Sequence, residues 1–164
     1  MRRNEKGFAE PHFVERDESF VQAVLRACNF YRMTHNVVRL SLDKSLTEYA
    51  QEWAEQLALE DRLRPRPNNV YGENLYRSTF KINAELHGQE PVEYWYSTKK
   101  YHTFKDPADI RAAPFTQLIW SDSRDIGVGV AKSKSDRTYM VANFNPPGNL
   151  VGHFAEQVPP MKCK

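Results

Sequence analysis

The side chains that could carry out acid–base or metal chemistry are few and scattered along the chain. Glu73, within Gly72-Glu73-Asn74-Leu75, could act as a general acid if a base or a metal ion lay beside it. Without such a partner, we interpret it as a structural carboxylate that accepts hydrogen bonds from the backbone or from tyrosines. Four of the five histidines do not have the spacing of metal ligands, and we interpret each as a surface or core residue: His35, His87, His102 and His153.

Nucleophile and cofactor motifs are absent from the sequence. There is no Gly-x-Ser-x-Gly, P-loop or dinucleotide fingerprint. Gly127-Val128-Gly129 lacks the third glycine and lies in an alternating run, so close packing of strands explains it better. Of the two cysteines, Cys28 lies in a helical pattern and is expected to pack as a small hydrophobe. A disulfide with Cys163 is open, but no pattern supports it. We therefore expect no catalytic residue, no metal and no cofactor.

Composition fits one soluble domain. The chain has 164 residues, 40% of them hydrophobic, and a formal net charge of +2, which is too small and dispersed to argue for nucleic acid. The basic cluster of residues 62–66 is broken by Leu63 and Pro65, so we interpret it as a solvated loop. No signal peptide, myristoylation site or membrane-spanning run is visible. We expect an intracellular protein, or an extracellular one if the natural chain carries a leader that this sequence lacks.

Helical periodicity dominates the first two thirds of the chain. A polar tail over residues 1–16 precedes a helix that starts near Asp17 or Ser19 and runs to about Thr34. Residues 45–48 have the capping-box pattern for a second helix with a clear apolar stripe through residue 58. A third helix has Pro91 in its first turn, and a fourth covers Pro114 to Trp120. One domain is expected over residues 17–158, followed by a tail over 159–164.

The last third changes its period from 3.6 to 2. Residues 126–130 and 139–144 alternate in polarity around a polar run, which predicts a β-hairpin. Residues 70–76 are expected to be a strand or an extended segment. Pro147 and Gly148 fit the two central positions of a type II turn. Helices first and paired strands last predict an α+β fold with helices packed on an antiparallel sheet.

Four motifs together resemble the CAP superfamily of cysteine-rich secretory, antigen 5 and pathogenesis-related proteins. They are residues 29–32, 72–75, 115–120 and 143–149, in the family's order over most of the chain. The resemblance implies a three-layer α-β-α sandwich and is strongest to the intracellular, Golgi-associated branch. It gives a structural role to the signature residues Asn29, Tyr31, Arg32, Gly72, Asn74, Phe115, Gln117, Trp120, Asn143, Gly148 and Asn149.

The family's cleft holds two histidines and two glutamates that can bind a divalent metal. Position by position, the resemblance assigns one glutamate to Glu73, the other to Thr98, one histidine to Pro114 and the other to Pro65. Three of these four residues cannot act as the family's ligands, since proline has no side-chain donor or acceptor and threonine has only a neutral hydroxyl. His102, one helical turn after Thr98, could face the same degenerate cleft.

These residues predict a non-enzymatic protein that acts through a protein partner, a homodimer or a lipid surface, with peripheral Golgi membrane as one location. One alternative is a sterol or fatty-acid carrier, with residues 77–88 and the neighbouring aromatics as its binding region. The other is a weak residual hydrolase that depends on Glu73. Core packing is the expected role of Trp95, and an open aromatic groove is the second interpretation.

Overall fold

The computed structural model of the chain describes residues 13–78, 87–103 and 109–162. Its elements, in order, are α1 (Phe13–Thr34), β1 (Ser41–Leu42), α2 (Lys44–Glu60), β2 (Gly72–Arg77), α3 (Gln89–Ser97), the 3-10 helices η1 (Thr98–Tyr101) and η2 (Ile110–Ala112), α4 (Ala113–Ile119), β3 (Asp125–Lys132), β4 (Thr138–Asn145) and α5 (Phe154–Gln157).

The four strands form one mixed sheet in the order β1-β3-β4-β2. The predicted hairpin is confirmed, because β3 and β4 pair antiparallel with Val128 opposite Ala142. β2 pairs antiparallel with the other side of β4, and β1 adds two residues parallel to β3. The predicted α+β class is therefore confirmed.

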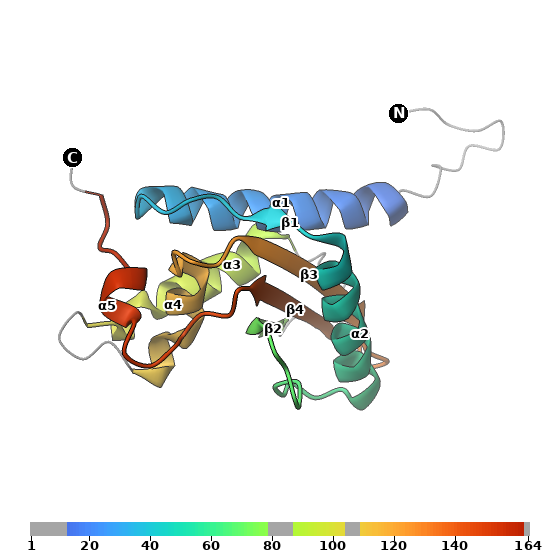
Figure 1. Cartoon of the computed structure of the whole chain (residues 1–164). Helices are drawn as coiled ribbons and strands as arrows, with labels where there is room; N and C mark the ends of the chain where they lie inside the picture. The colour runs from blue at the N-terminus through green and yellow to red at the C-terminus, as the bar shows by residue number, and fades with distance from the viewer. Residues whose placement is uncertain (1–12, 79–86, 104–108, 163–164) are drawn as a thin grey trace.

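The two faces of the sheet carry different helices, so the fold has three layers (Figure 1). Alternate residues of β4 point to opposite faces. Met140, Ala142 and Phe144 join the larger core, to which α1, α3 and α4 contribute. Tyr139 and Val141 pack instead against α2. The α-β-α sandwich implied by the family resemblance is what the structure shows.

The glycines of β3 let α2 lie directly on the sheet. A Cβ added to Gly127 would lie 2.2 Å from the carbonyl carbon of Leu46, and one added to Gly129 would lie 2.4 Å from the amide nitrogen of Gln51. The sequence predicted close packing of strands at this run. The close contact is instead between β3 and the backbone of α2. A side chain at either glycine would push α2 away from the sheet.

Several local predictions need correction. The first helix begins at Phe13, before Asp17. The second is capped by Asp43, whose carboxylate accepts the Leu46 N–H at 2.7 Å, so it starts one residue before the predicted capping box. The type II turn is wrong: the Asn145–Pro146 bond is cis, and the left-handed residue is Asn149, at φ 58°, rather than Gly148.

Candidate functional site

Glu73 lies on β2 opposite Asn143, on the face of the sheet that α2 covers. Both of its carboxylate oxygens accept the backbone N–H of Arg66 at 3.3 Å, and one accepts the Asn69 amide at 3.3 Å. Burial raises the pKa of Glu73, although these N–H donors and the Arg66 charge act in the other direction. The carboxylate is thus a half-buried acceptor held by the loop after α2, next to Pro65.

Arg66 fixes that loop, a role that sequence reasoning missed. Its guanidinium lies 3.7 Å from the centre of the Tyr49 ring, donates to the Tyr49 carbonyl at 2.7 Å and pairs with Glu52 at 3.0 Å. Arg64 similarly lies over Trp53 and pairs with Glu60 at 2.8 Å. The loop predicted over residues 62–66 is observed, but these two arginines are partly buried and bond to α2. The available signal was the aromatic and acidic face of α2 beside a loop of arginines.

Thr98 connects α3 to the start of α4, and Pro114 connects β2 to the same place. The Thr98 hydroxyl donates to the Trp95 carbonyl at 2.7 Å and accepts the Phe115 N–H at 3.0 Å. The Pro114 carbonyl accepts the Asn74 amide at 3.0 Å, and Pro114 lies in the first turn of α4, as predicted. Both residues therefore serve to join elements of the scaffold.

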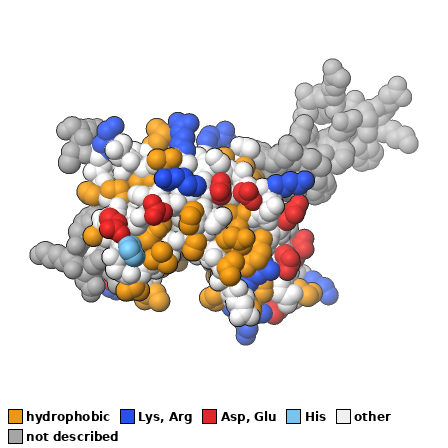
Figure 2. Space-filling view, viewed as in Figure 1, with side chains coloured by type: hydrophobic (Ala, Val, Ile, Leu, Met, Phe, Trp, Pro, Cys, Tyr) orange, Lys and Arg blue, Asp and Glu red, His pale blue; other side chains and the backbone are white. Residues whose placement is uncertain are grey.

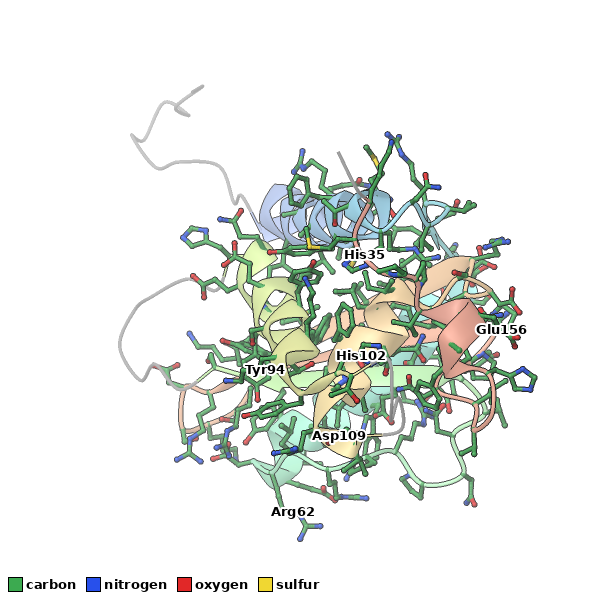
Figure 3. All side chains as sticks on the ribbon, turned by 90° about the vertical axis from the view of Figure 1, so that its left-hand side faces the viewer. His35, Arg62, Tyr94, His102, Asp109 and Glu156 are labelled. Carbon is green, nitrogen blue, oxygen red and sulfur yellow. The ribbon has the colours of Figure 1, made fainter. Side chains whose placement is uncertain are left out.

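Two histidines flank Phe115 in an aromatic cluster. The ring centres of His35 and His102 each lie 5.5 Å from that of Phe115, and burial lowers the pKa of both imidazoles. His35 is also bonded to the Pro159 carbonyl at 2.8 Å and to the Tyr96 hydroxyl at 2.9 Å. Tyr96 in turn stacks on Tyr31 at 3.9 Å. Figure 3 shows His35 below α1 and His102 beside the start of α4.

The predicted cleft residues thus fall into two groups. Glu73 makes its polar contacts with the loop that contains Pro65, whereas Thr98, Pro114 and His102 surround Phe115 on the other side of the sheet. The described partners of Glu73 are N–H donors, namely the Arg66 backbone N–H and the Asn69 amide. Within residues 13–78, 87–103 and 109–162, no three histidine, cysteine, aspartate or glutamate side chains gather closely enough to hold a metal ion.

The signature residues bond mainly to backbone. Asn29 exchanges two hydrogen bonds with the backbone of Leu40, and Asn143 donates to the Gly72 carbonyl. Gln117 accepts the Gly148 N–H at 2.9 Å, and a Cβ on Gly72 would lie 2.1 Å from the Gln117 Oε1. Asn149 donates to the Ala113 carbonyl. The side chains of Arg32, Phe115 and Trp120 are almost completely buried.

Comparison with known proteins agrees with this scaffold. The profile of the cysteine-rich secretory protein family, CAP, matches residues 25–144. The chain belongs to the CAP family. Golgi-associated plant pathogenesis-related protein 1 of Homo sapiens is 34% identical over 151 residues, which cover 88% of this chain and 96% of that protein. A PR-1 type pathogenesis-related protein of Sambucus nigra is 28% identical over 137 residues, covering 80% and 78%.

Solved CAP structures share the fold at lower identity. BmVAL-1 superposes with a TM-score of 0.68 at 20% identity, covering 89% of this chain and 85% of its own. A structure of NaASP2 that contains Zn²⁺ gives a TM-score of 0.61 at 18% identity, covering 99% and 93%. At these identities the likeness shows the fold of this CAP protein and carries no metal site over to it.

Other predicted features are placed as follows. Trp95 is completely buried and donates to the Leu75 carbonyl at 2.8 Å, so its expected core role is confirmed. The Cys28 thiol is free and buried, and burial raises its pKa to about 12, while Cys163 lies outside the described residues. Most of the predicted lipid-carrier segment, residues 79–86, also lies outside them. Among the described helices, none is long and apolar enough to cross a bilayer.

Proposed function

We propose that this CAP protein is non-enzymatic, that the family's metal and acid–base group is lost in it, and that it acts by binding the surface of an anionic membrane. The observation that carries the first part is the arrangement around Glu73. Its carboxylate is held by the Arg66 N–H and the Asn69 amide. Of the positions that could supply partners, Thr98 bonds to the backbone through its hydroxyl, and Pro114 has no side-chain donor or acceptor. A general acid needs a base, a nucleophile or a metal within reach.

The proposed membrane-binding surface, which we call the α1 patch, consists of Arg26, Phe30 and Met33 on the outer face of α1 and of Arg39, which follows the helix. Phe30 and Met33 lie one helical turn apart and are 62% and 52% exposed. Arg26 and Arg39 are exposed beside them, and the four side chains share a shallow hollow of about 310 Å³. Apolar side chains bordered by arginines suit a negatively charged lipid surface, because the apolar side chains enter the interface while the guanidinium groups meet the headgroups.

The name of the human relative supports this target, because it describes a Golgi-associated protein. A peripheral contact through the α1 patch needs no membrane-spanning helix. We therefore propose the Golgi membrane as the location. The protein would bind one face of this bilayer, and the binding would be reversible.

Vesicle co-sedimentation tests the membrane proposal. Phosphatidylcholine vesicles with and without phosphatidylserine are compared, and binding is expected only to the anionic vesicles. Each basic residue near such a surface contributes about 1 kcal/mol, so Arg26→Gln with Arg39→Gln should weaken binding about thirtyfold. A matched charge control outside the α1 patch is Arg62→Gln with Lys134→Gln. Equal weakening by the control, or equal binding to neutral vesicles, would overturn the proposal.

Calorimetric titration with Zn²⁺ tests the non-enzymatic part separately. We expect no binding that depends on Glu73. Zinc binding that disappears in Glu73→Ala, while Glu60→Ala retains it, would show a working ligand set and would contradict the loss of the family's chemistry.

A further inference from the structure

A groove of about 1000 Å³ runs between the first half of α1 and α2, beyond the α1 patch. Its floor and near wall are apolar: Val21 comes from α1, Leu42 ends β1, and Val128 and Val130 belong to β3. β1 pairs with β3 only at Asp125 and Ile126, so no other strand among the described residues covers the rest of that edge, and the groove lies beside it. Figure 2 shows acidic side chains in the region where Figure 1 draws α2.

The backbone of this strand edge is already bonded to α2. Gln51 accepts the Val130 N–H at 2.8 Å and donates to the Val130 carbonyl at 3.0 Å. The Thr47 hydroxyl accepts the Val128 N–H at 3.4 Å. An extended peptide that added a strand here would have to displace these side chains. An occupant that satisfies its own backbone, as a helix does, fits the groove without breaking them.

The α2 wall of the groove is acidic. Glu48, Glu52 and Glu55 follow one another at four and three residues, so they form a row about 10 Å long on one face of the helix. Glu52 pairs with Arg66, whereas Glu48 and Glu55 form no ion pair within the part of the chain that the structure describes. Lys44 is the single cation among the lining residues. The negative charge of this row would repel a ligand with a carboxylate or phosphate group and would attract a cationic ligand.

We propose that the groove binds a basic amphipathic helix of a partner protein. Its apolar face would cover Leu42 and Val130, and its lysines or arginines would lie opposite Glu48 and Glu55. This proposal is independent of the membrane proposal, because the two surfaces have opposite charge and share only Gln22 among their lining residues.

A designed probe tests the groove in the full chain. The probe is a fluorescent peptide of about 18 residues, built from Leu, Ala and Lys in an amphipathic helical pattern, and a peptide with Glu in place of Lys is its control. Fluorescence anisotropy should show binding of the basic peptide only, weaker at about 1 M than at about 0.1 M salt. Glu48→Gln with Glu55→Gln should weaken binding about tenfold. Glu93→Gln with Glu156→Gln, the same charge change outside the groove, should leave it unchanged.

Nuclear magnetic resonance locates the peptide. Shifts at the Val130 amide and the Gln51 side-chain amide are expected, with little change at Phe30 or Met33. Binding of both peptides alike, or shifts confined to the α1 patch, would overturn the proposal. Other occupants would overturn it too: a fatty acid retained in the groove, a concentration-dependent dimer that shifts the same amides, or binding that appears only when residues 1–12 are removed.

Discussion

Replacing Arg32 by methionine should cost the fold several kcal/mol, although the residue touches no proposed binding surface. Its guanidinium is fully buried and donates to four backbone carbonyls. Nε reaches Val38 at 2.7 Å, and the two Nη atoms reach Leu118 at 3.0 Å, Trp120 at 2.9 Å and Ser123 at 2.8 Å. The side chain thus joins the end of α1 to the end of α4 and the turn that follows.

The magnitude follows from these four bonds and from the cost of burial. A hydrogen bond from a charged donor contributes about 1.5–3 kcal/mol, so four contribute at least about 6 kcal/mol. Burial lowers the pKa of Arg32 from 12.5 to about 10, which corresponds to a desolvation cost of about 3 kcal/mol. Methionine recovers that cost and loses the bonds, so we expect a net loss of at least about 3 kcal/mol.

Urea unfolding at neutral pH, followed by tryptophan fluorescence, measures this loss. Arg32→Lys keeps the charge but places its three donors on one nitrogen, and should fall between wild type and Arg32→Met. Arg26→Met, an exposed site on the same helix, is the matched control and should change stability little. A loss below about 1 kcal/mol for Arg32→Met, at an unchanged urea slope, would refute the reasoning.

Three further predictions use the same unfolding assay. Burial lowers the pKa of His35 and His102 from 6.5, so the unfolded chain binds protons first and stability should fall as the pH drops below about 6.5; a flat profile would contradict this. Burial raises the pKa of Glu73 from 4.5, so its ionised form costs stability, and Glu73→Gln should gain stability relative to wild type as the pH rises above about 4.5; a growing loss would point to a needed carboxylate. Gly127→Ala places a Cβ against the α2 backbone and should cost about 1–3 kcal/mol; an unchanged stability would contradict the close contact.

Elements whose pattern repeats locally could be predicted from the sequence. The apolar stripe of α2 comes from residues three and four apart, and the hairpin from strict alternation, so neither needs knowledge of distant contacts. Pro114 in the first turn of α4 is predictable for the same reason. Helix starts were less accurate, because the cap of α2 depends on which nearby carboxylate or hydroxyl reaches the free N–H groups, and Asp43 does so before Ser45.

The site depended on contacts that no local pattern contains. Arg32 meets carbonyls 86 to 91 positions away, and Thr98 accepts an N–H 17 positions along the chain. Arg66 was misread because its partners, Tyr49 and Glu52, belong to a helix that ends before the loop begins. Composition describes such a loop as polar, while only the fold shows that its guanidinium lies on an aromatic ring.

The residues that identify the family differ from those that form the two proposed binding surfaces, for a membrane and for a basic helix. Asn29, Gln117, Asn143 and Asn149 bond to the backbone of distant segments, so selection for the fold alone is enough to explain why such residues would form a signature. Chemistry at the cleft can then change without loss of the scaffold, because Thr98 and Pro114 still join α3 to α4 and β2 to α4. Membership in the family therefore informs the fold of this chain, and its function has to be argued from surfaces such as the α1 patch and the acidic groove.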